Sequence, residues 1–429
     1  VQKVVLLLTD AEGYQVIPMK ERSKNYLSVV VILSLAGILI QWSLSTTRQP
    51  FLPDSQVAYN ITRQTALVVF PKVEGRKIDD PCLQKTVPDL ELRYPTDAYE
   101  HFYHIHRLLS NWSIHRHQYL GYKGPKLENY WNSTFHHLAS NQTALKENFG
   151  NYIPLFVPWM DIFMTNKRRF PQEFRDLLGS ALRSDVPYVT VSQHCSGITG
   201  YGALKFRPNI LVFSGGGFGH IPIPLLLKEL KPNDRPSNKS LHMTFYGTPR
   251  NSLRKDVCKF VDEESAVQGW SVEMCTKRKD WLAGLENSTI GLCPRGWGRT
   301  SFRLSETIQV GVIPWYVYDD VAWIPYANLW ESLGLPTSSI KTFQRDLKEA
   351  SKWNDTQLSA LQIAVSKIQN HFTYSGTMEQ IKRYLRREST DLLCQKHPMC
   401  PISPNCSRPI KNGILATSHN WSAAKVGAY

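Results

Sequence analysis

Several common signatures are missing from this sequence. None of its eight cysteines forms a C-x-x-C pair, which argues against a zinc ribbon and against a thioredoxin-like redox site. Zinc-finger spacing, RNA-binding signatures and basic helices with heptads are absent as well, so we expect no nucleic-acid partner. The chain also has no internal repeat and no long low-complexity tract. These absences favour an ordinary globular protein.

Acidic residues are in the minority, because 36 Asp and Glu stand against 50 Lys and Arg and give a formal net charge of +14. The positive charges are scattered, and such an excess suits an anionic partner such as a sugar nucleotide, an acidic polysaccharide or a membrane face. Hydrophobic residues make up 42% of the chain, enough for a sizeable core. The length of 429 residues favours two packed domains with appendages.

One long uncharged run lies near the N-terminus, at residues 26–44. At about 1.5 Å per residue it just spans a hydrocarbon core of about 30 Å. Three basic residues precede the run and only Arg48 follows it closely, which predicts a cytosolic N-terminus and a lumenal C-terminus. A cleaved signal peptide is the alternative, but the run is long for one and no A-x-A site follows. We therefore predict a cytosolic tail at 1–25 and a transmembrane signal-anchor at 26–44.

The chain begins with Val1, while Met19 stands directly before the basic cluster. We therefore expect residues 1–18 to be upstream or fragment sequence.

Glycosylation sequons occur only after the uncharged run. The motif N-x-S/T is found at Asn60, Asn111, Asn132, Asn141, Asn238, Asn287, Asn354, Asn405 and Asn420. This one-sidedness supports a lumenal body. The even number of cysteines, three of them near the C-terminus, indicates disulfides in an oxidising compartment, with buried free thiols as the alternative. Their connectivity does not follow from the sequence.

Apolar runs and helical patterns alternate along the rest of the chain. The predicted buried strands are Ile153–Val157, Tyr188–Val191, Ile210–Phe213, Met243–Tyr246, Thr289–Leu292 and Val312–Tyr318. The predicted helices are Pro171–Arg183, Arg250–Glu264, Phe302–Val310 and Asp355–Phe372. This alternation is typical of an α/β protein with parallel sheets. We predict a stem at 45–88, two Rossmann-like domains at 89–212 and 213–387, and a Cys- and Pro-rich tail at 388–429.

A glycine-rich loop, SGGGFGH, follows the predicted strand at 210–213. A dinucleotide site needs such a loop to open a helix that faces the pyrophosphate. Here Pro222 and Pro224 follow, which do not start a helix cleanly, and no suitable acidic residue comes later. We therefore expect a flexible interdomain or substrate-facing loop and not an NAD site.

The segment from Ile290 to Trp315 is the richest in chemistry and predicts a strand, a glycine turn, a helix and a second strand. Gly296 and Gly298 allow main-chain amides to approach a ligand closely. The guanidinium groups of Arg295, Arg299 and Arg303 suit phosphate oxygens. Ser301 stands where the helix begins, so its hydroxyl could cap the helix or bind phosphate. Glu306 shares a helix face with Arg303 and could accept both ribose hydroxyl hydrogens. The alternative is a plain salt bridge between these two residues.

This segment resembles the signature of the exostosin family, glycosyltransferase family 47. The matching elements are CPRGWG, then SFRL-x-E, a GVIP turn and the acidic pair Asp319-Asp320. Upstream, IPIP at 221–224 and FYGT with Arg250 and Arg254 are similar to further elements of that family. The resemblance covers about residues 95–385 and is strongest over 290–330. Val312, where the family usually has Cys, and Gln309, where it has a small residue, depart from the pattern and blur the subfamily.

The resemblance implies a GT-B fold, in which two Rossmann-like domains face a cleft and 213–387 binds the nucleotide sugar while 89–212 binds the acceptor. It implies a Golgi membrane enzyme, a hexosyl- or glycuronosyltransferase, that moves a sugar from a UDP-sugar to a glycan with inversion. On this reading Arg295, Gly296, Ser301, Arg303 and Glu306 bind the nucleotide. His194 and Asp161 are the candidate bases, because each follows a predicted strand at the cleft.

No D-x-D triplet occurs in the chain. Because GT-A transferases hold a divalent cation with that triplet, we expect no metal and no other cofactor. The histidines between His101 and His137 look metal-like, but their aromatic surroundings favour surface or core packing.

Two other functions remain open. The first is a catalytically inactive exostosin-like subunit that stabilises a second transferase as a homo- or heterodimer partner. The second is a carbohydrate-binding module on a membrane stalk, which a body of GT-B size makes the weakest of the three.

Overall fold

The structure is a computed structural model that describes residues 7–10, 13–16, 29–32, 39–42, 74–85, 89–112, 126–167, 169–195, 197–198, 208–231, 239–277 and 279–395. By its contacts the chain divides into two compact units, Val1–Thr65 and Ala66–Tyr429. The division falls inside the predicted stem at 45–88, and residues 74–85 of that stretch are described as part of the second unit.

Two antiparallel hairpins are described in the first unit. β1 (Leu7–Asp10) pairs with β2 (Gly13–Val16), and β3 (Val29–Ile32) pairs with β4 (Leu39–Trp42). β3 and β4 lie inside 26–44, where we predicted a transmembrane helix, and the other residues of that run are outside the described part. Because most of this run lies outside the described residues, the transmembrane anchor stays a prediction. Among the described residues, no helix has both the length and the apolar character needed to cross a membrane.

The first sheet of the second unit is parallel throughout, with the order β10-β9-β8-β7. Its strands are β7 (Ile153–Pro154), β8 (Tyr188–Ser192), β9 (Ile210–Ser214) and β10 (Ile221–Pro222). Every residue of these strands is buried, as expected for a parallel sheet covered on both faces. Beside it, β5 (Gly75–Ile78) and β6 (Leu92–Pro95) form an antiparallel pair.

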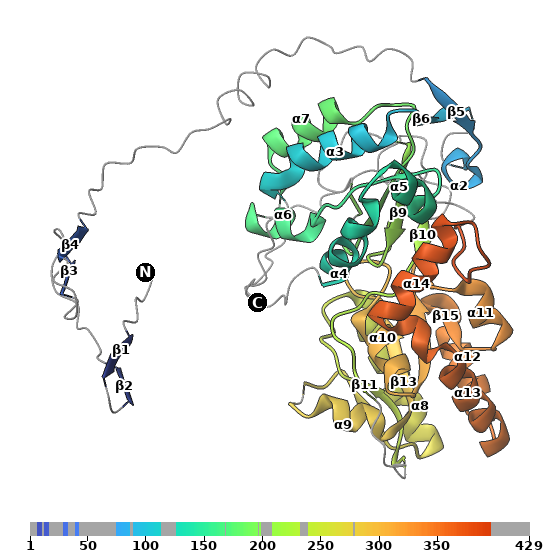
Figure 1. Ribbon diagram of the computed structural model, residues 1–429. Helices are drawn as coiled ribbons and strands as arrows, with labels where there is room; N and C mark the ends of the chain where they lie inside the picture. The colour runs from blue at the N-terminus through green and yellow to red at the C-terminus, as the bar shows by residue number, and fades with distance from the viewer. Residues whose placement is uncertain are drawn as a thin grey trace. The chain divides into compact units, whose positions relative to one another are not determined.

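Helices surround this first sheet (Figure 1). They are α2 (Pro81–Gln84), α3 (Ala98–Leu109), α4 (Lys126–Phe135), α5 (Gln142–Phe149), α6 (Trp159–Thr165) and α7 (Gln172–Ala181), with 3-10 turns at Ser110–Trp112 and His136–Ala139. The helix α4 carries an apolar stripe of Leu127, Trp131 and Phe135, and all three side chains are fully or almost fully buried.

The second sheet is also parallel, with the order β12-β11-β13-β14-β15. Its strands are β11 (Leu241–Phe245), β12 (Val272–Met274), β13 (Ser288–Pro294), β14 (Ile313–Tyr318) and β15 (Thr337–Ser339). In chain order this is the 2-1-3-4-5 arrangement of doubly wound folds, in which the strand order reverses between the first and third strands. In this protein the reversal lies between β11 and β13.

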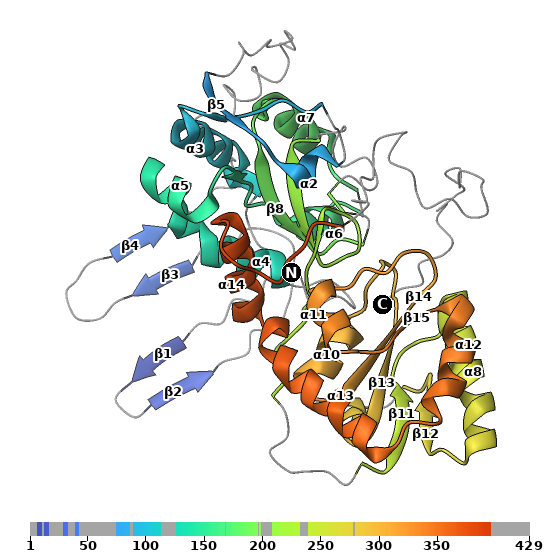
Figure 2. The same cartoon turned by 90° about the vertical axis from the view of Figure 1, so that its right-hand side faces the viewer.

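Helices flank the second sheet on two sides, with α8 and α12 on one and α10 and α13 on the other (Figure 2). The helices of this part are α8 (Ser252–Gln268), α9 (Trp281–Glu286), α10 (Phe302–Gln309), α11 (Ala327–Ser332), α12 (Ile340–Ala350) and α13 (Asp355–Ile368), followed by a 3-10 turn at Gln369–Phe372. Asn354 starts α13 with a capping box, in which its side chain accepts the Gln357 amide and its own amide donates to the Gln357 side chain.

After the second sheet the chain returns to the first-sheet region through α14 (Tyr374–Leu385). The Tyr374 ring stacks on Tyr130 of α4 at 4.9 Å, and Arg386 donates to the Asn148 side chain of α5 at 2.6 Å. A disulfide then joins Cys394 to Cys82 of α2 across 312 positions of sequence. One continuous hydrophobic core runs from Ile78 to Leu392 and includes both sheets. The second disulfide, Cys258–Cys275, ties α8 to the end of β12.

The predicted alternation of strands and helices is confirmed, since each predicted strand overlaps β7, β8, β9, β11, β13 or β14 and each predicted helix overlaps α7, α8, α10 or α13. An α/β protein with two parallel sheets is therefore shown. The predicted domain boundary at 212/213 lies inside β9, which pairs with β10 in the first sheet. β10 is only two residues long and contains a proline, so the sequence gives no strand signal there.

Candidate functional site

The carboxyl ends of β11 and β13 mark the place where the order of the second sheet reverses. In open α/β sheets, ligands bind in the crevice outside the carboxyl ends of strands at such a point. Here two helices begin beside it: α8, capped by the Asn251 side chain on the Arg254 amide, and α10, capped by the Ser301 side chain on the Arg303 amide. Helix N-termini favour anions, since their amides and dipoles point at the ligand.

Arg254, on the first turn of α8, joins the two strand ends. Its guanidinium donates to the main-chain oxygens of Thr248, Pro294 and Arg295 at 3.3, 3.4 and 3.0 Å. It also lies over the Phe245 ring at 5.2 Å. This arginine therefore fixes the loop after β11 against the loop after β13 and places a cation at the reversal point.

Arg295 and Arg299 lie in the loop after β13 and are both paired with the acidic residues that follow β14. Arg295 forms a two-pronged pair with Asp319, at 2.5 and 2.6 Å, and Arg299 pairs with Asp320 at 2.6 Å. Hydrogen bonding and the charge of Arg295 hold the pKa of Asp319 below its ordinary value in spite of burial. The predicted phosphate ligand Arg295 thus already has a carboxylate partner.

Arg303 and Glu306 stand on the first turns of α10 as an ion pair, with Nη1 and Oε2 3.0 Å apart. Arg303 also donates to the Tyr246 main-chain oxygen at 2.8 Å and lies over the Trp281 ring at 4.0 Å. Glu306 is only 6% exposed, and burial raises its pKa while the charges of Arg303 and Lys228 oppose the rise. The salt bridge that sequence reasoning kept as an alternative is therefore present.

Gly296 and Gly298 both have a structural reason in this loop. The Gly296 amide donates to the Thr300 oxygen at 2.8 Å, which closes the loop on itself. At Gly298 a Cβ would lie 1.9 Å from the Gly216 oxygen. The second glycine is therefore required by the close approach of two backbones.

The glycine loop after β9 is the other half of this contact. The Arg299 amide donates to the Gly216 oxygen at 3.2 Å, and a Cβ on Gly216 would lie 2.0 Å from the His194 oxygen. Trp323, fully buried, donates its indole N–H to the Ser214 oxygen at 3.0 Å. We refer to residues 214–217 with 298–299 as the glycine seam. We predicted a flexible interdomain or substrate-facing loop; the loop is buried and hydrogen-bonded to the loop after β13.

The candidate bases His194 and Asp161 follow strands of the first sheet and are 1% and 2% exposed. The His194 ring packs edge-on against Phe163 at 4.5 Å, and burial lowers its pKa to about 4. The structure brings both residues close to one carboxylate, that of Glu128 on α4.

Glu128 accepts the amide of Gln193, next to His194, at 2.8 Å and the amide of Met160, next to Asp161, at 2.9 Å. It is fully buried, and burial raises its pKa to about 8 although these amides oppose the rise. Sequence reasoning missed this residue. The available signal was a carboxylate on the apolar face of a helix, directly after Leu127 of the buried stripe.

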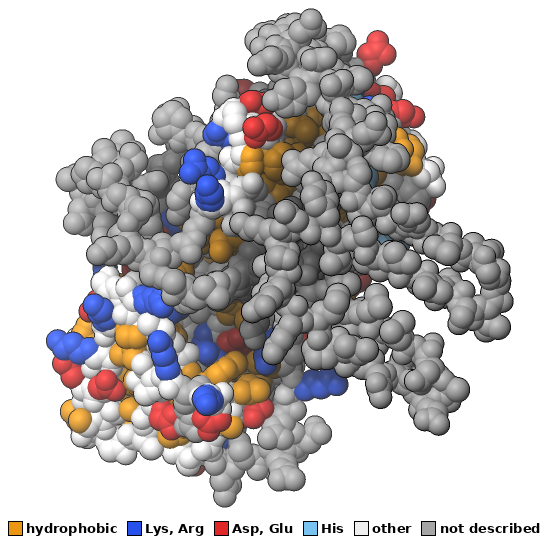
Figure 3. Space-filling view, turned by 90° about the vertical axis from the view of Figure 1, so that its left-hand side faces the viewer, with side chains coloured by type: hydrophobic (Ala, Val, Ile, Leu, Met, Phe, Trp, Pro, Cys, Tyr) orange, Lys and Arg blue, Asp and Glu red, His pale blue; other side chains and the backbone are white. Residues whose placement is uncertain are grey.

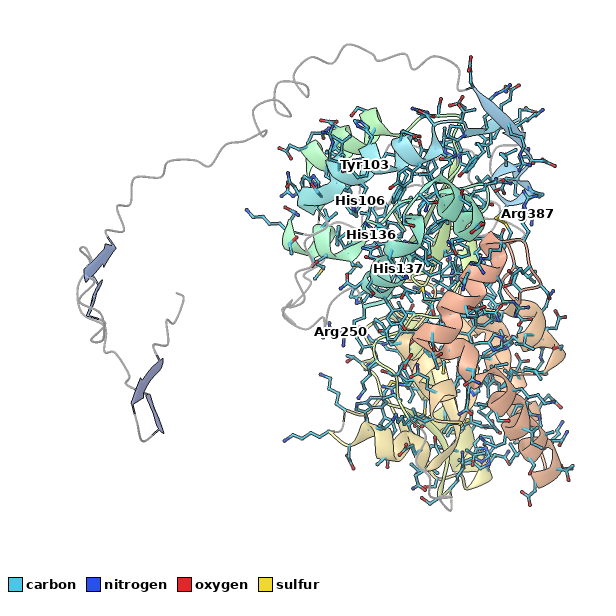
Figure 4. The ribbon with its side chains drawn as sticks, viewed as in Figure 1. Tyr103, His106, His136, His137, Arg250 and Arg387 are labelled. Atoms are coloured by element: carbon cyan, nitrogen blue, oxygen red, sulfur yellow. A yellow bond between two sulfur atoms is a disulfide. The ribbon has the colours of Figure 1, made fainter. Side chains whose placement is uncertain are left out.

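The described histidines of the metal-like group include both core and surface residues. His101 is buried and bonds the Tyr188 hydroxyl at 2.7 Å, and His106 meets His136 with 2.8 Å between their Nε2 atoms (Figure 4). Within the described ranges, no group of three or more His, Cys, Asp or Glu could hold a metal ion.

Neither a protein-family model nor a curated protein sequence matches this chain. Two solved structures are similar to it in part. The crystal structure of the GtfA/B complex has 10% sequence identity and a TM-score of 0.29, over 47% of this chain and 46% of that one. The glycosyltransferase of kitacinnamycin has 13% identity and a TM-score of 0.26, over 50% and 61%.

The chain thus spans about half the length of the first of these structures. At such TM-scores the likeness supports no argument about activity. The exostosin resemblance therefore rests on the sequence motif and stays a prediction.

The glycine seam leads to a prediction about stability. Gly298→Ala should destabilise the protein by about 1–3 kcal/mol, because its Cβ meets a main-chain oxygen that cannot move without displacing β9. Gly296→Ala is the matched control two residues away, since its nearest neighbour would be 3.3 Å from the new Cβ. Thermal unfolding of both variants checks this; equal melting temperatures would show that the seam is looser than described.

Proposed function

We propose that this protein is a glycosyltransferase that moves a sugar from a nucleotide sugar, a UDP-sugar in particular, to a glycan acceptor with inversion at the anomeric carbon. The observation that carries the proposal is the strand reversal between β11 and β13, flanked by two helix N-termini and by Arg254, Arg295 and Arg303. This is the arrangement that suits a diphosphate. The GT-B fold and membership of the exostosin family belong to the same proposal.

The donor diphosphate would lie at the N-termini of α8 and α10. Its charge would be met by main-chain amides, by Arg254 and by Arg295, whose Asp319 partner would have to share the guanidinium with a phosphate oxygen. Ser301 would cap α10 beside it. Glu306, held by Arg303, would accept the ribose hydroxyls.

The reaction is a single displacement. The acceptor hydroxyl oxygen forms a bond to the anomeric carbon while the bond from that carbon to the diphosphate oxygen breaks, and the hydroxyl proton passes to a base. His194 and Asp161 remain the candidates for that base, and Glu128 orients the chain segments that carry them. The leaving group departs as a nucleoside diphosphate, stabilised by the arginines and helix N-termini, so we propose that no metal is needed.

The second function, an inactive subunit that stabilises another transferase, is favoured by one observation. Arg295, Arg299 and Arg303 each have an acidic partner within the chain, which a structural scaffold would also produce. The two functions can be told apart, because only the active enzyme should turn over a sugar donor.

The test is incubation of the full-length protein with a panel of UDP-sugars, with and without EDTA, while released UDP is measured. We expect slow hydrolysis of one donor that persists in EDTA. UDP binding without turnover of any donor would support the inactive subunit, and strict dependence on added Mn²⁺ would contradict the metal-independent mechanism.

Glu306→Gln tests the nucleotide site. Charge-assisted hydrogen bonds contribute on the order of 1.5–3 kcal/mol, so UDP affinity should fall roughly ten- to a hundredfold. Because Glu306 is a buried partner of Arg303, a lowered melting temperature should accompany the loss. Glu349→Gln, on the surface pair Lys352–Glu349, is the control for removing a carboxylate without touching the site. Calorimetric titration with UDP measures the affinity. A destabilised Glu306 variant with unchanged UDP affinity would show that the Arg303–Glu306 pair has only a structural role.

We also propose a single-pass type II Golgi membrane protein with a lumenal body. The sequons after residue 44 and the disulfides Cys82–Cys394 and Cys258–Cys275 support an oxidising, glycosylating compartment. The uncharged run at 26–44 is the sequence feature that supports an anchor.

Sequon occupancy is the corresponding prediction. Asn141 and Asn354 are exposed and should carry glycans, whereas Asn132 is 7% exposed on α4 and should not. Glycosidase treatment and peptide mapping of protein from intact microsomes measure this, together with protease protection of the body. Digestion of the body without detergent, or a chain with no glycans, would refute the lumenal topology.

A further inference from the structure

Trp297 differs from the other tryptophans whose side chains the structure describes. Its side chain is 56% exposed, while the rest are buried or half-buried. Among the described residues, no aromatic ring contacts the Trp297 ring and no group accepts a hydrogen bond from its indole N–H. An indole left in water is an unused apolar surface that suits a ligand with one apolar face and one polar edge.

The exposure does not come from a loose loop. On one side of Trp297, the Gly296 amide bonds the Thr300 oxygen and Arg295 is held by two bonds to Asp319. On the other side, Arg299 is held by Asp320 and by the Gly216 oxygen. The indole is therefore presented by a backbone that is already ordered, so a ligand that stacks on it does not have to order the loop.

The position of this loop matters as much as its rigidity. It follows the carboxyl end of β13. A Cβ on Gly298 would lie 1.9 Å from the Gly216 oxygen and 3.3 Å from the Cys195 Cα, and both of these residues come after strands of the first sheet. Trp297 is thus next to the point where the strand ends of both sheets meet. In the proposed function that point lies between the donor and the acceptor.

We propose that Trp297 is a stacking platform for a pyranose ring of the acceptor glycan. The inference rests on the proposed function and names its second substrate more closely. A pyranose presents a face of C–H groups to the indole and keeps its hydroxyls at the edge. A nucleobase is also flat, but small ligands are mostly enclosed when bound. An open, one-sided surface suits a chain that extends away from the site.

The charges of the Trp297 loop agree with a neutral or mixed ligand more than with a strongly anionic one. In the described part of the face in Figure 3, Lys and Arg side chains lie interspersed with Asp and Glu. The arginines of the Trp297 loop are, in addition, both paired with aspartates.

The experiment compares wild type with Trp297→Ala and Trp297→Phe in the full-length protein. The control is Ile363→Ala, which removes an equally exposed apolar side chain on α13. The probe is a panel of pyranose oligosaccharides (glucan, mannan, xylan and glycosaminoglycan fragments). Three quantities are measured: oligosaccharide binding from the change in tryptophan fluorescence, UDP affinity, and donor hydrolysis without acceptor.

We expect at least one oligosaccharide to bind wild type and the Ile363 variant equally. Affinity should fall roughly ten- to a hundredfold in Trp297→Ala and recover in part in Trp297→Phe, the range known for ring stacking. UDP affinity and donor hydrolysis should not change in either Trp297 variant.

Three results would overturn the proposal: no oligosaccharide changes the fluorescence of wild type, the Trp297→Ala variant binds as well as wild type, or it loses UDP affinity instead. The last result would assign the ring to the nucleobase. Oligosaccharide binding that depends on Trp297, in a protein that hydrolyses no donor, would keep the platform and reject the enzymatic function.

Discussion

The contact on which the rest of the body depends is the approach of the Gly216 carbonyl to the backbone at Gly298 and Arg299. No side chain fits between the two loops at Gly298, because a Cβ there would lie 1.9 Å from the Gly216 oxygen. A distance set by two backbones is harder to change than one set by side chains, which can adopt other rotamers. The contact also brings the carboxyl ends of β9 and β13 together, so loops from both parallel sheets meet at one place. The site exists because these ends converge.

The ion pairs around this contact fix the orientation of the arginine side chains more than they stabilise the fold. Arg295, Arg299 and Arg303 are each paired with a carboxylate and largely removed from water. Burying an ion pair costs desolvation energy that its attraction barely repays, so three such pairs in one loop and helix are a poor source of stability. They do fix the direction of three guanidinium groups. A polar environment that is already oriented is what stabilises a developing charge, since nothing has to reorganise during the reaction.

The sequence was sufficient for what depends on local pattern and insufficient for what depends on tertiary contact. Strands such as Tyr188–Ser192 were predictable, because a fully buried parallel strand is a plain apolar run. The cap at Ser301 and the Arg303–Glu306 pair followed from helix spacing. The partners of Arg295 and Arg299 lie on another strand, and the role of Glu128 depends on amides 32 and 65 positions away. The short β10 has no pattern of its own and exists only through its pairing with β9.

The return of the chain through α14 gives the two sheet regions a second connection. A two-sheet body joined only by one crossover would be free to open as a hinge. Here the chain crosses between the sheet regions once after Pro222 and again at α14, and the Cys82–Cys394 disulfide fastens the second crossing to α2. The Arg386–Asn148 and Tyr130–Tyr374 contacts and the continuous core act in the same direction. The two sheet regions are therefore joined at two places, by the glycine seam and by α14 with its disulfide. The loops after β11 and β13, which carry Arg254 and Arg295, are therefore held in fixed positions relative to the first sheet.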